Sequence, residues 1–177
     1  MKRTKKILIG LLFFVLTVVG STGVAYAWFS AQGKVRGINI SVANSGLLVN
    51  GESEWTSGVN FNNIFPGWSS DPIAVAISNI SGGDYPLEVK ARVLFTGVDF
   101  DALAETMEMA IHEEGSLTAP DYQTLTWWSE TGKVLGNFTS GEVKNYNLLF
   151  KVPSSAGDEI QNILLSVSVL LTGTQAI

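Results

Sequence analysis

The chain has 177 residues and a formal charge of −5, and 46% of its residues are hydrophobic while 15% are charged. It has no cysteine, which excludes disulfide bonds, a cysteine nucleophile and lipid attachment to a cysteine. After residue 27 the few basic residues are dispersed and outnumbered by acidic ones, which argues against nucleic acid or anionic lipid as a partner.

The N-terminal segment predicts an export signal. Basic residues between positions 2 and 6 precede an uncharged apolar run over 7–20, and the small-x-small site Ala25-Tyr26-Ala27 follows. We expect a signal peptidase to remove residues 1–27 between Ala27 and Trp28, leaving a secreted protein or cell-surface protein. The alternative is a retained membrane anchor, because residues 7–33 carry no charge and are long enough to cross a bilayer.

Residues 28–177 predict one all-β domain. They hold seven basic and sixteen acidic residues, a formal charge of −9, and a length that suits a single core. Apolar and polar residues alternate in the segments expected to be half-buried strands. These strands lie at 38–42, 73–77, 87–95, 107–111, 146–152 and 163–171.

The connections predict how the strands are arranged. A glycine-rich turn at 81–84 predicts that the strands on either side of it form an antiparallel hairpin. Acidic residues at the start of 99–107 predict one short helix that crosses between sheets, and 115–130 is expected to be a loop. The expected fold is a single jelly-roll or immunoglobulin-like antiparallel β-sandwich.

Catalytic patterns are scarce, so the sequence predicts neither an enzyme nor a cofactor or metal site. The single histidine, His112, lacks both a Gly-x-Ser-x-Gly elbow and the second histidine of a zinc site, and we interpret it as a strand end beside an acidic turn. Three carboxylate pairs lack a calcium-loop pattern and are interpreted as solvated turn residues. They are Glu52 and Glu54, Asp99 and Asp101, and Asp158 and Glu159.

Two further features leave alternatives open. Four tryptophans in or near expected loops suit either sugar stacking, as in a carbohydrate-binding module, or core packing. They are Trp55, Trp68, Trp127 and Trp128. Asn39, Asn79 and Asn137 begin Asn-x-Ser/Thr sequons, which would carry glycans only in a host with that machinery.

Five short marks run in order along the chain. The first is the junction Gly23-Val24-Ala25-Tyr26-Ala27-Trp28-Phe29-Ser30, followed by the strand Gly37–Val42. Next come the turn Phe61-Asn62-Asn63-Ile64-Phe65-Pro66-Gly67 and the strand 73–79 with its Ser81-Gly82 turn. The C-terminal strand then closes with Thr172-Gly173-Thr174-Gln175.

In this order the marks resemble those of the exported biofilm-fibre proteins of the TasA and camelysin type. Trp68 stands where that family usually has an acidic residue, and the turn after Asn79 is looser than the family's. The resemblance implies a jelly-roll subunit of extracellular biofilm-matrix or pilus-like fibres, released by a dedicated signal peptidase. Its partners would be further copies of itself, joined head to tail, with an accessory matrix protein or polysaccharide as further partners.

The resemblance also implies a way of joining subunits, in which a freed N-terminal segment enters a groove of the next subunit as a donated strand. The candidate donor is 28–36, beginning at Trp28, with Phe29 and Ala31 facing inward and Val35 near its end. The alternative is that this segment is simply the first strand of its own sheet. Because the family has been described as containing a metallopeptidase, that activity is a further, weaker alternative.

Overall fold

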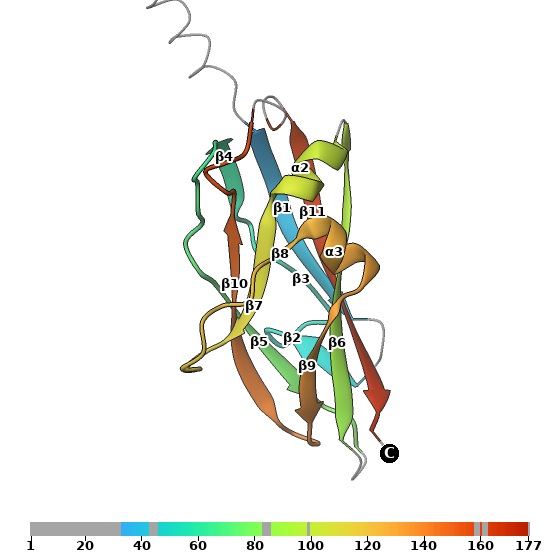
Figure 1. The fold of residues 1–177 in the computed structure, drawn as a ribbon. Coiled ribbons are helices and arrows are strands. Elements are labelled where there is room, and N and C mark those ends of the chain that lie inside the picture. Colours follow the sequence, from blue (N-terminus) through green and yellow to red (C-terminus); the bar gives the residue numbers. More distant parts are fainter. Residues whose placement is uncertain are drawn as a thin grey trace, which may run out of the picture. The chain divides into compact units, whose positions relative to one another are not determined.

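The computed structural model describes residues 33–42, 46–82, 86–98, 100–157, 160 and 163–176. Residues 33–177 form one compact unit in which two β-sheets pack face to face (Figure 1). The expected all-β sandwich is therefore confirmed.

The first sheet, sheet A, has the strand order β3-β1-β11-β6-β9, and β4 also pairs with β1. Its strands are β1 (Gly33–Val42), β3 (Glu54–Thr56), β4 (Asn60–Ile64), β6 (Leu87–Val98), β9 (Lys133–Phe138) and β11 (Leu164–Gln175). The β1–β11 pair is parallel, whereas the other pairs in this sheet are antiparallel.

The second sheet, sheet B, has the order β2-β5-β10-β7-β8 and is antiparallel throughout. Its strands are β2 (Leu47–Val49), β5 (Ile73–Asn79), β7 (Glu108–Glu113), β8 (Gln123–Thr124) and β10 (Val143–Lys151). The core lies between the sheets, where the alternating apolar residues of the predicted strands are buried. The expected strands at 38–42, 73–77, 87–95, 107–111, 146–152 and 163–171 are thus present as β1, β5, β6, β7, β10 and β11. Several are longer than expected: β1 begins five residues earlier and β11 ends four residues later. Strands β2, β3, β4, β8 and β9 were not expected.

The predicted hairpin of 73–77 with 87–95 is wrong. These segments are β5 and β6, and they belong to opposite sheets. β6 instead pairs over its full length with the equally long β11, from Leu87 opposite Gln175 to Val98 opposite Leu164. Alternation fixes which face of a strand is buried but not which strand lies beside it, and a short turn does not require its flanking strands to pair.

The expectation of a single helix is also wrong, because the segment expected to be a loop contains a second one. The predicted helix is α2 (Phe100–Thr106), which connects sheet A to sheet B as expected, and the second is α3 (Leu125–Glu130). Thr124 caps α3, since its hydroxyl accepts a 3.2 Å hydrogen bond from the Trp127 backbone N–H. Trp128 is fully buried and its indole N–H donates to the Met109 carbonyl at 2.8 Å. Helix α3 thereby closes the flank of the sandwich between β6 and β7.

Among the described residues, no helix is both long and apolar enough to cross a membrane. The predicted signal peptide, 1–27, lies outside the described part of the chain, and so does the anchor alternative, 7–33, apart from its last residue.

Candidate functional site

A cleft of about 380 Å³ opens on one flank of the sandwich, between β4 of sheet A and the segment that leads into β5 of sheet B. The flank is open because β4 ends one sheet there and the first residues of β5 have no neighbour from β2. The cleft is lined by residues 59–62 and 68–73.

The Pro66-Gly67 turn places one wall of this cleft. The Trp68 N–H donates to the Phe65 carbonyl at 3.0 Å, and Gly67 has φ of +84°, so the four residues form a type II turn with Pro and Gly at its two central positions. The turn redirects the chain from the end of β4 in sheet A to sheet B. The Pro66-Gly67 turn thus has a local structural role.

After the turn, the chain is fixed along β10. The Val152 N–H donates to the Trp68 carbonyl and the Ser70 N–H donates to the Phe150 carbonyl, both at 2.8 Å. The Phe150 N–H donates in return to the Ser70 hydroxyl at 3.0 Å. Residues 68–70 therefore extend sheet B ahead of β5, and this wall of the cleft is backbone that is hydrogen-bonded to β10 and the residue after it.

The floor of the cleft is apolar and its rim is polar. The Phe61 ring contacts the rings of Trp68 and Phe150, with centroid distances of 4.9 and 5.4 Å, and Phe61 and Ile73 are each 8% exposed. Asn60, Asn62, Ser69 and Asp71 surround this floor. A floor of this kind suits apolar side chains carried by an extended polar backbone.

The edge of β5 that faces this flank offers unpaired backbone groups. Asn50 occupies the edge at Ala76, where its N–H donates to the Ala76 carbonyl and its side chain accepts from the Ala76 N–H, both at 2.8 Å. Because backbone groups alternate along a strand, the N–H and C=O of Ala74 point to the same side. No hydrogen bond within the described part of the chain reaches these two groups, and Ala74 is exposed.

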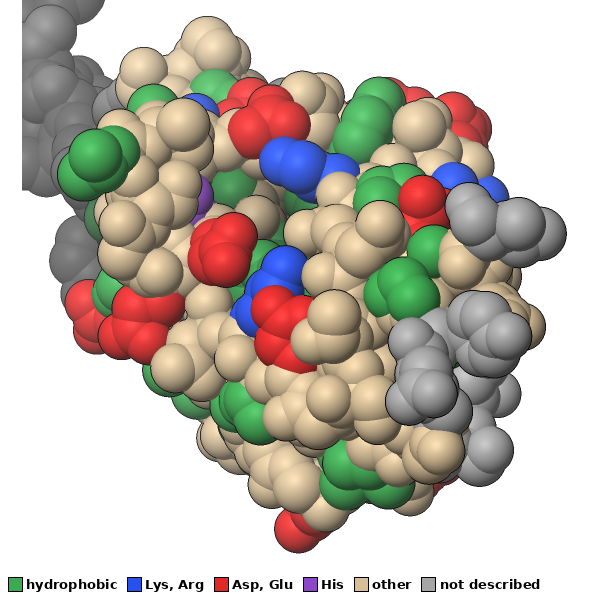
Figure 2. All heavy atoms as spheres, turned by 90° about the horizontal axis from the view of Figure 1, so that it is seen from below, with side chains coloured by type: hydrophobic (Ala, Val, Ile, Leu, Met, Phe, Trp, Pro, Cys, Tyr) green, Lys and Arg blue, Asp and Glu red, His purple; other side chains and the backbone are tan. Residues whose placement is uncertain are grey.

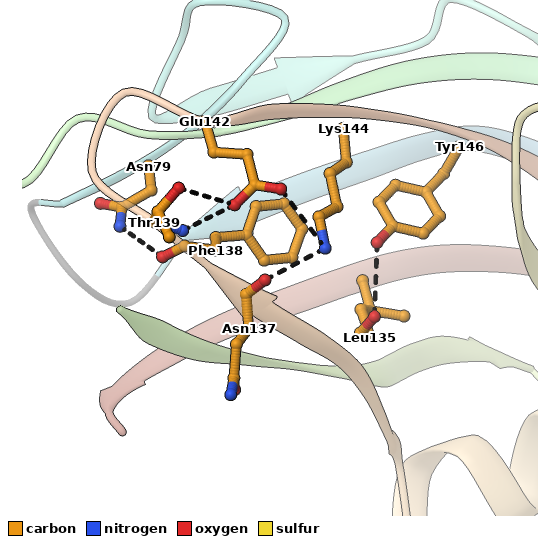
Figure 3. Close-up of polar contacts among 8 residues, drawn as sticks. All are labelled: Asn79, Leu135, Asn137, Phe138, Thr139, Glu142, Lys144 and Tyr146. Carbon is orange, nitrogen blue, oxygen red and sulfur yellow. Dashed lines mark hydrogen bonds and ion pairs between the residues drawn. The ribbon is translucent and has the colours of Figure 1, made fainter. Parts of the chain in front are cut away.

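The opposite flank is closed in two different ways. Towards one end α3 fills the gap between the sheets, and towards the other end side chains of β10 reach the backbone of β9 (Figure 3). Lys144 Nζ donates to the Asn137 carbonyl at 3.0 Å, and the Tyr146 hydroxyl donates to the Leu135 carbonyl at 3.4 Å. Glu142 accepts at 2.7 Å from the Thr139 N–H, in the turn between the two strands.

Two of these side chains have shifted pKa values. The Thr139 backbone N–H, followed by the Thr139 hydroxyl and then the nearby Lys144 charge, lowers the pKa of the Glu142 carboxyl. Burial, with smaller contributions from the charges of Glu113 and Glu142, raises the pKa of Tyr146 to about 12. Lys144 also lies 4.7 Å from the centre of the Phe138 ring and 3.6 Å from Glu142.

The buried Asn79 adds a further contact between the two sheets on this flank, at the end of β9. Its side-chain amide donates to the Phe138 carbonyl at 2.9 Å, and its oxygen accepts from the N–H and hydroxyl of Ser81. The sequon at Asn79 is therefore sequestered in the folded chain, whereas Asn39 and Asn137 are exposed.

Of the candidate donor residues, the structure places only the last. Val35 is fully buried in β1, where it pairs with Leu165 of β11 and Phe61 of β4 in the same chain. Ala25, Ala27, Trp28, Phe29 and Ala31 lie outside the described residues. The roles predicted for these residues stay predictions.

The residues considered for catalysis or metal binding do not come together. His112 lies in β7 opposite Asn147 of β10, and within the described ranges no three His, Asp or Glu side chains are grouped to hold a metal ion. Glu52, Glu54 and Asp101 are exposed, whereas Asp99, Asp158 and Glu159 lie outside the described ranges. The expectation that the chain is not an enzyme stays a prediction.

The tryptophans pack mainly inward. Trp128 belongs to the core, and Trp55, Trp68 and Trp127 are half-buried against it. Among these four, Trp68 is the one that lines the cleft. Figure 2, which views the end of the molecule opposite α2, shows acidic and basic side chains interspersed and no continuous basic surface.

The comparisons with known proteins add no relative: no family model matches the chain, and no curated protein matches it. The resemblance to the TasA and camelysin type therefore rests on the sequence marks alone.

Proposed function

We propose that this chain is a secreted structural subunit of extracellular fibres of the TasA and camelysin type. Subunits join head to tail when the N-terminal segment of one copy enters the β4–β5 cleft of the next. The observation that carries this proposal is an unpaired strand edge at Ala74 beside a cleft with an apolar floor.

The physical argument follows from the chemistry of a strand edge. A donated strand satisfies the free N–H and C=O of Ala74 with its own backbone, while its alternate side chains cover Phe61 and Ile73. A contact between two different surfaces does not close on itself, so it repeats into a filament. The absence of cysteine fits this assembly, because exported fibres of this chain depend on packing and backbone pairing alone.

Fewer residues are available for donation than the sequence suggested. Because residues from Gly33 onward already form β1 in their own sheet, the donated part is 28–32. Five residues span about 17 Å as a strand, close to the usual strand length. Phe29 and Ala31 are two residues apart and so lie on the same face of such a strand.

The first experiment compares purified chains of residues 28–177 and 33–177 by negative-stain microscopy and light scattering. We expect filaments from the longer chain and monomers from the shorter one, which keeps the whole compact unit. Normal filaments from residues 33–177 would refute donation by this segment.

The second experiment tests the cleft. Ala74→Pro removes the free N–H without breaking a bond to β10, so we expect it to stop assembly while leaving the fold intact. Ala74→Val is the matched control, because it enlarges the side chain but keeps the N–H, and it should assemble normally. Equal assembly of the two variants would place the acceptor elsewhere.

A second candidate function is polysaccharide binding in the same cleft, favoured by Trp68 beside the polar side chains of Asn60, Asn62 and Asp71. Retention of the non-assembling 33–177 chain on matrix polysaccharide, lost in Trp68→Ala, would support it. The absence of retention would leave fibre formation as the single function proposed.

A further inference from the structure

The second flank of the sandwich contains an unusual link between consecutive strands. β9 and β10 are joined by a short turn, in which the Glu142 N–H donates to the Thr139 carbonyl at 3.0 Å. Strands joined in this way normally pair as a hairpin. Here they do not, because β9 lies at the edge of sheet A and β10 lies inside sheet B.

Side chains of β10 and its preceding turn take the place of the missing backbone pairing. Glu142 contacts residue 139, Lys144 contacts residue 137 and Tyr146 contacts residue 135 (Figure 3). These three contacts follow the register that an antiparallel hairpin would have, with a step of two residues on each strand. The Lys144 contact falls on the Asn137 carbonyl of β9, the strand whose other side is paired with β6.

The consequence concerns the edge of β9. An edge strand with free N–H and C=O groups is a template for pairing with another chain. Lys144 occupies the Asn137 carbonyl and brings a positive charge to this edge. A strand from another copy would have to displace the Lys144 ammonium in order to pair here. On the opposite flank, no side chain within the described residues bonds to the backbone groups of Ala74.

We infer that Lys144, held by Glu142 and Phe138, is a specificity-determining residue that keeps the β9 edge closed to the edge strand of a second copy. Edge closure itself does not depend on the proposed function. Its consequence for fibres rests on that proposal: with one flank closed, each subunit accepts one strand and the filament does not branch.

The test uses residues 33–177, the compact unit, because this chain lacks the proposed donor. Lys144→Met removes the charge and the bond to Asn137 but keeps much of the aliphatic stem. We expect the variant to form dimers or larger species by size-exclusion chromatography with light scattering, at concentrations where the unchanged unit is a monomer. Lys144→Arg keeps a cationic donor and should stay monomeric.

Lys90→Met is the matched control for the loss of one positive charge. Lys90 lies on β6, and its ammonium makes no ion pair or hydrogen bond in the described part of the chain. This variant should stay monomeric. If Lys90→Met also forms dimers, association results from the change in net charge, and the inference is overturned.

A second substitution identifies the surface that associates. Asn137→Pro, added to Lys144→Met, blocks strand addition at an outward-facing N–H of β9 without removing a bond to β6. It should restore the monomer. Persistent dimers in the double variant would show that association does not use this edge.

Lys144→Gln is the second variant if Lys144→Met fails to fold, because it keeps a polar side chain that is too short to reach Asn137. A monomeric, folded Lys144→Met or Lys144→Gln unit would overturn the inference. The donation experiment is unaffected by either result, since it compares chains that all retain Lys144.

Discussion

The side-chain amide of Asn79, at the end of β5 in sheet B, donates a 2.9 Å hydrogen bond to the backbone carbonyl of Phe138, at the end of β9 in sheet A. Both residues are fully buried, so this bond ties the two sheets together away from solvent. The Asn79 oxygen accepts from the N–H and hydroxyl of Ser81, which fixes the chain where it leaves β5.

This relationship predicts a large loss of stability in Asn79→Ala. The substitution leaves a buried carbonyl and the Ser81 donors without partners, and we expect it to lower the free energy of unfolding by about 2–3 kcal/mol. Ser81→Ala removes only the hydroxyl of the same turn and should cost about 1 kcal/mol. Urea unfolding followed by tryptophan fluorescence measures both, and equal costs would contradict the role assigned to the Asn79 amide.

Replacing individual glycines with alanine should lower the stability of the chain to different degrees. Gly132→Ala should be the most damaging, because its φ is +66° and a Cβ there would lie 2.6 Å from the Ala91 carbonyl oxygen. Gly67→Ala has space, since Ser154 is the nearest residue at 3.7 Å, but its φ of +84° should cost about 1–2 kcal/mol.

Gly82→Ala is the control for this series. Gly82 has no positive φ, and a methyl group added there would have no atom within 4 Å, so its replacement should be neutral or slightly stabilising. Thermal unfolding of the three variants should therefore rank them with Gly82→Ala highest and Gly132→Ala lowest. Any other ranking would contradict these backbone assignments.

The buried indole of Trp128 predicts that α3 is essential to one flank of the sandwich. Trp128→Phe removes the donor to the Met109 carbonyl and leaves a small cavity, which should cost about 2–3 kcal/mol. Trp127→Phe alters the half-buried neighbour, whose indole N–H has no bond within the described residues, and should cost less than about 1 kcal/mol. Similar losses in both variants would argue against a special role for the Trp128 bond.

The inward faces of the strands were predictable because burial in a sandwich imposes a period of two on the sequence. Ile73, Val75 and Ile77 show this period, and all three are buried. The partner of each strand was not predictable in the same way. β5 and β6 show equally good alternation, and their assignment to opposite sheets depends on long-range pairing with β10 and β11.

The candidate site was predictable only in part. Pro66-Gly67 marked the turn that places the cleft wall, because a proline and a glycine at those positions suit a type II turn. The edge at Ala74 has no local signal, since it is free only because β2 is short. Helix α3 was not predicted, because 115–130 was expected to be a loop, although Thr124 supplies a capping signal just ahead of the helix.

The phenol of Tyr146 predicts a specific response to alkaline pH. Burial raises its pKa from 10.0 to about 12, so the neutral hydroxyl is favoured in the folded chain relative to the unfolded one. A pKa that is higher in the folded state contributes stability that is fully present below pH 10 and is lost as the pH rises towards 12. The free energy of unfolding should therefore fall across this window.

Tyr146→Phe should lack this component, so the stability difference between the unchanged chain and the variant should shrink as the pH rises through the window. Tyr122→Phe is the control, because its ring stacks under Lys151 and its hydroxyl has no hydrogen bond among the described residues. Urea midpoints measured at several pH values across the window provide the comparison. A difference that stays constant for Tyr146→Phe would mean that the Tyr146 hydroxyl is not held neutral by its buried place between β10 and β9.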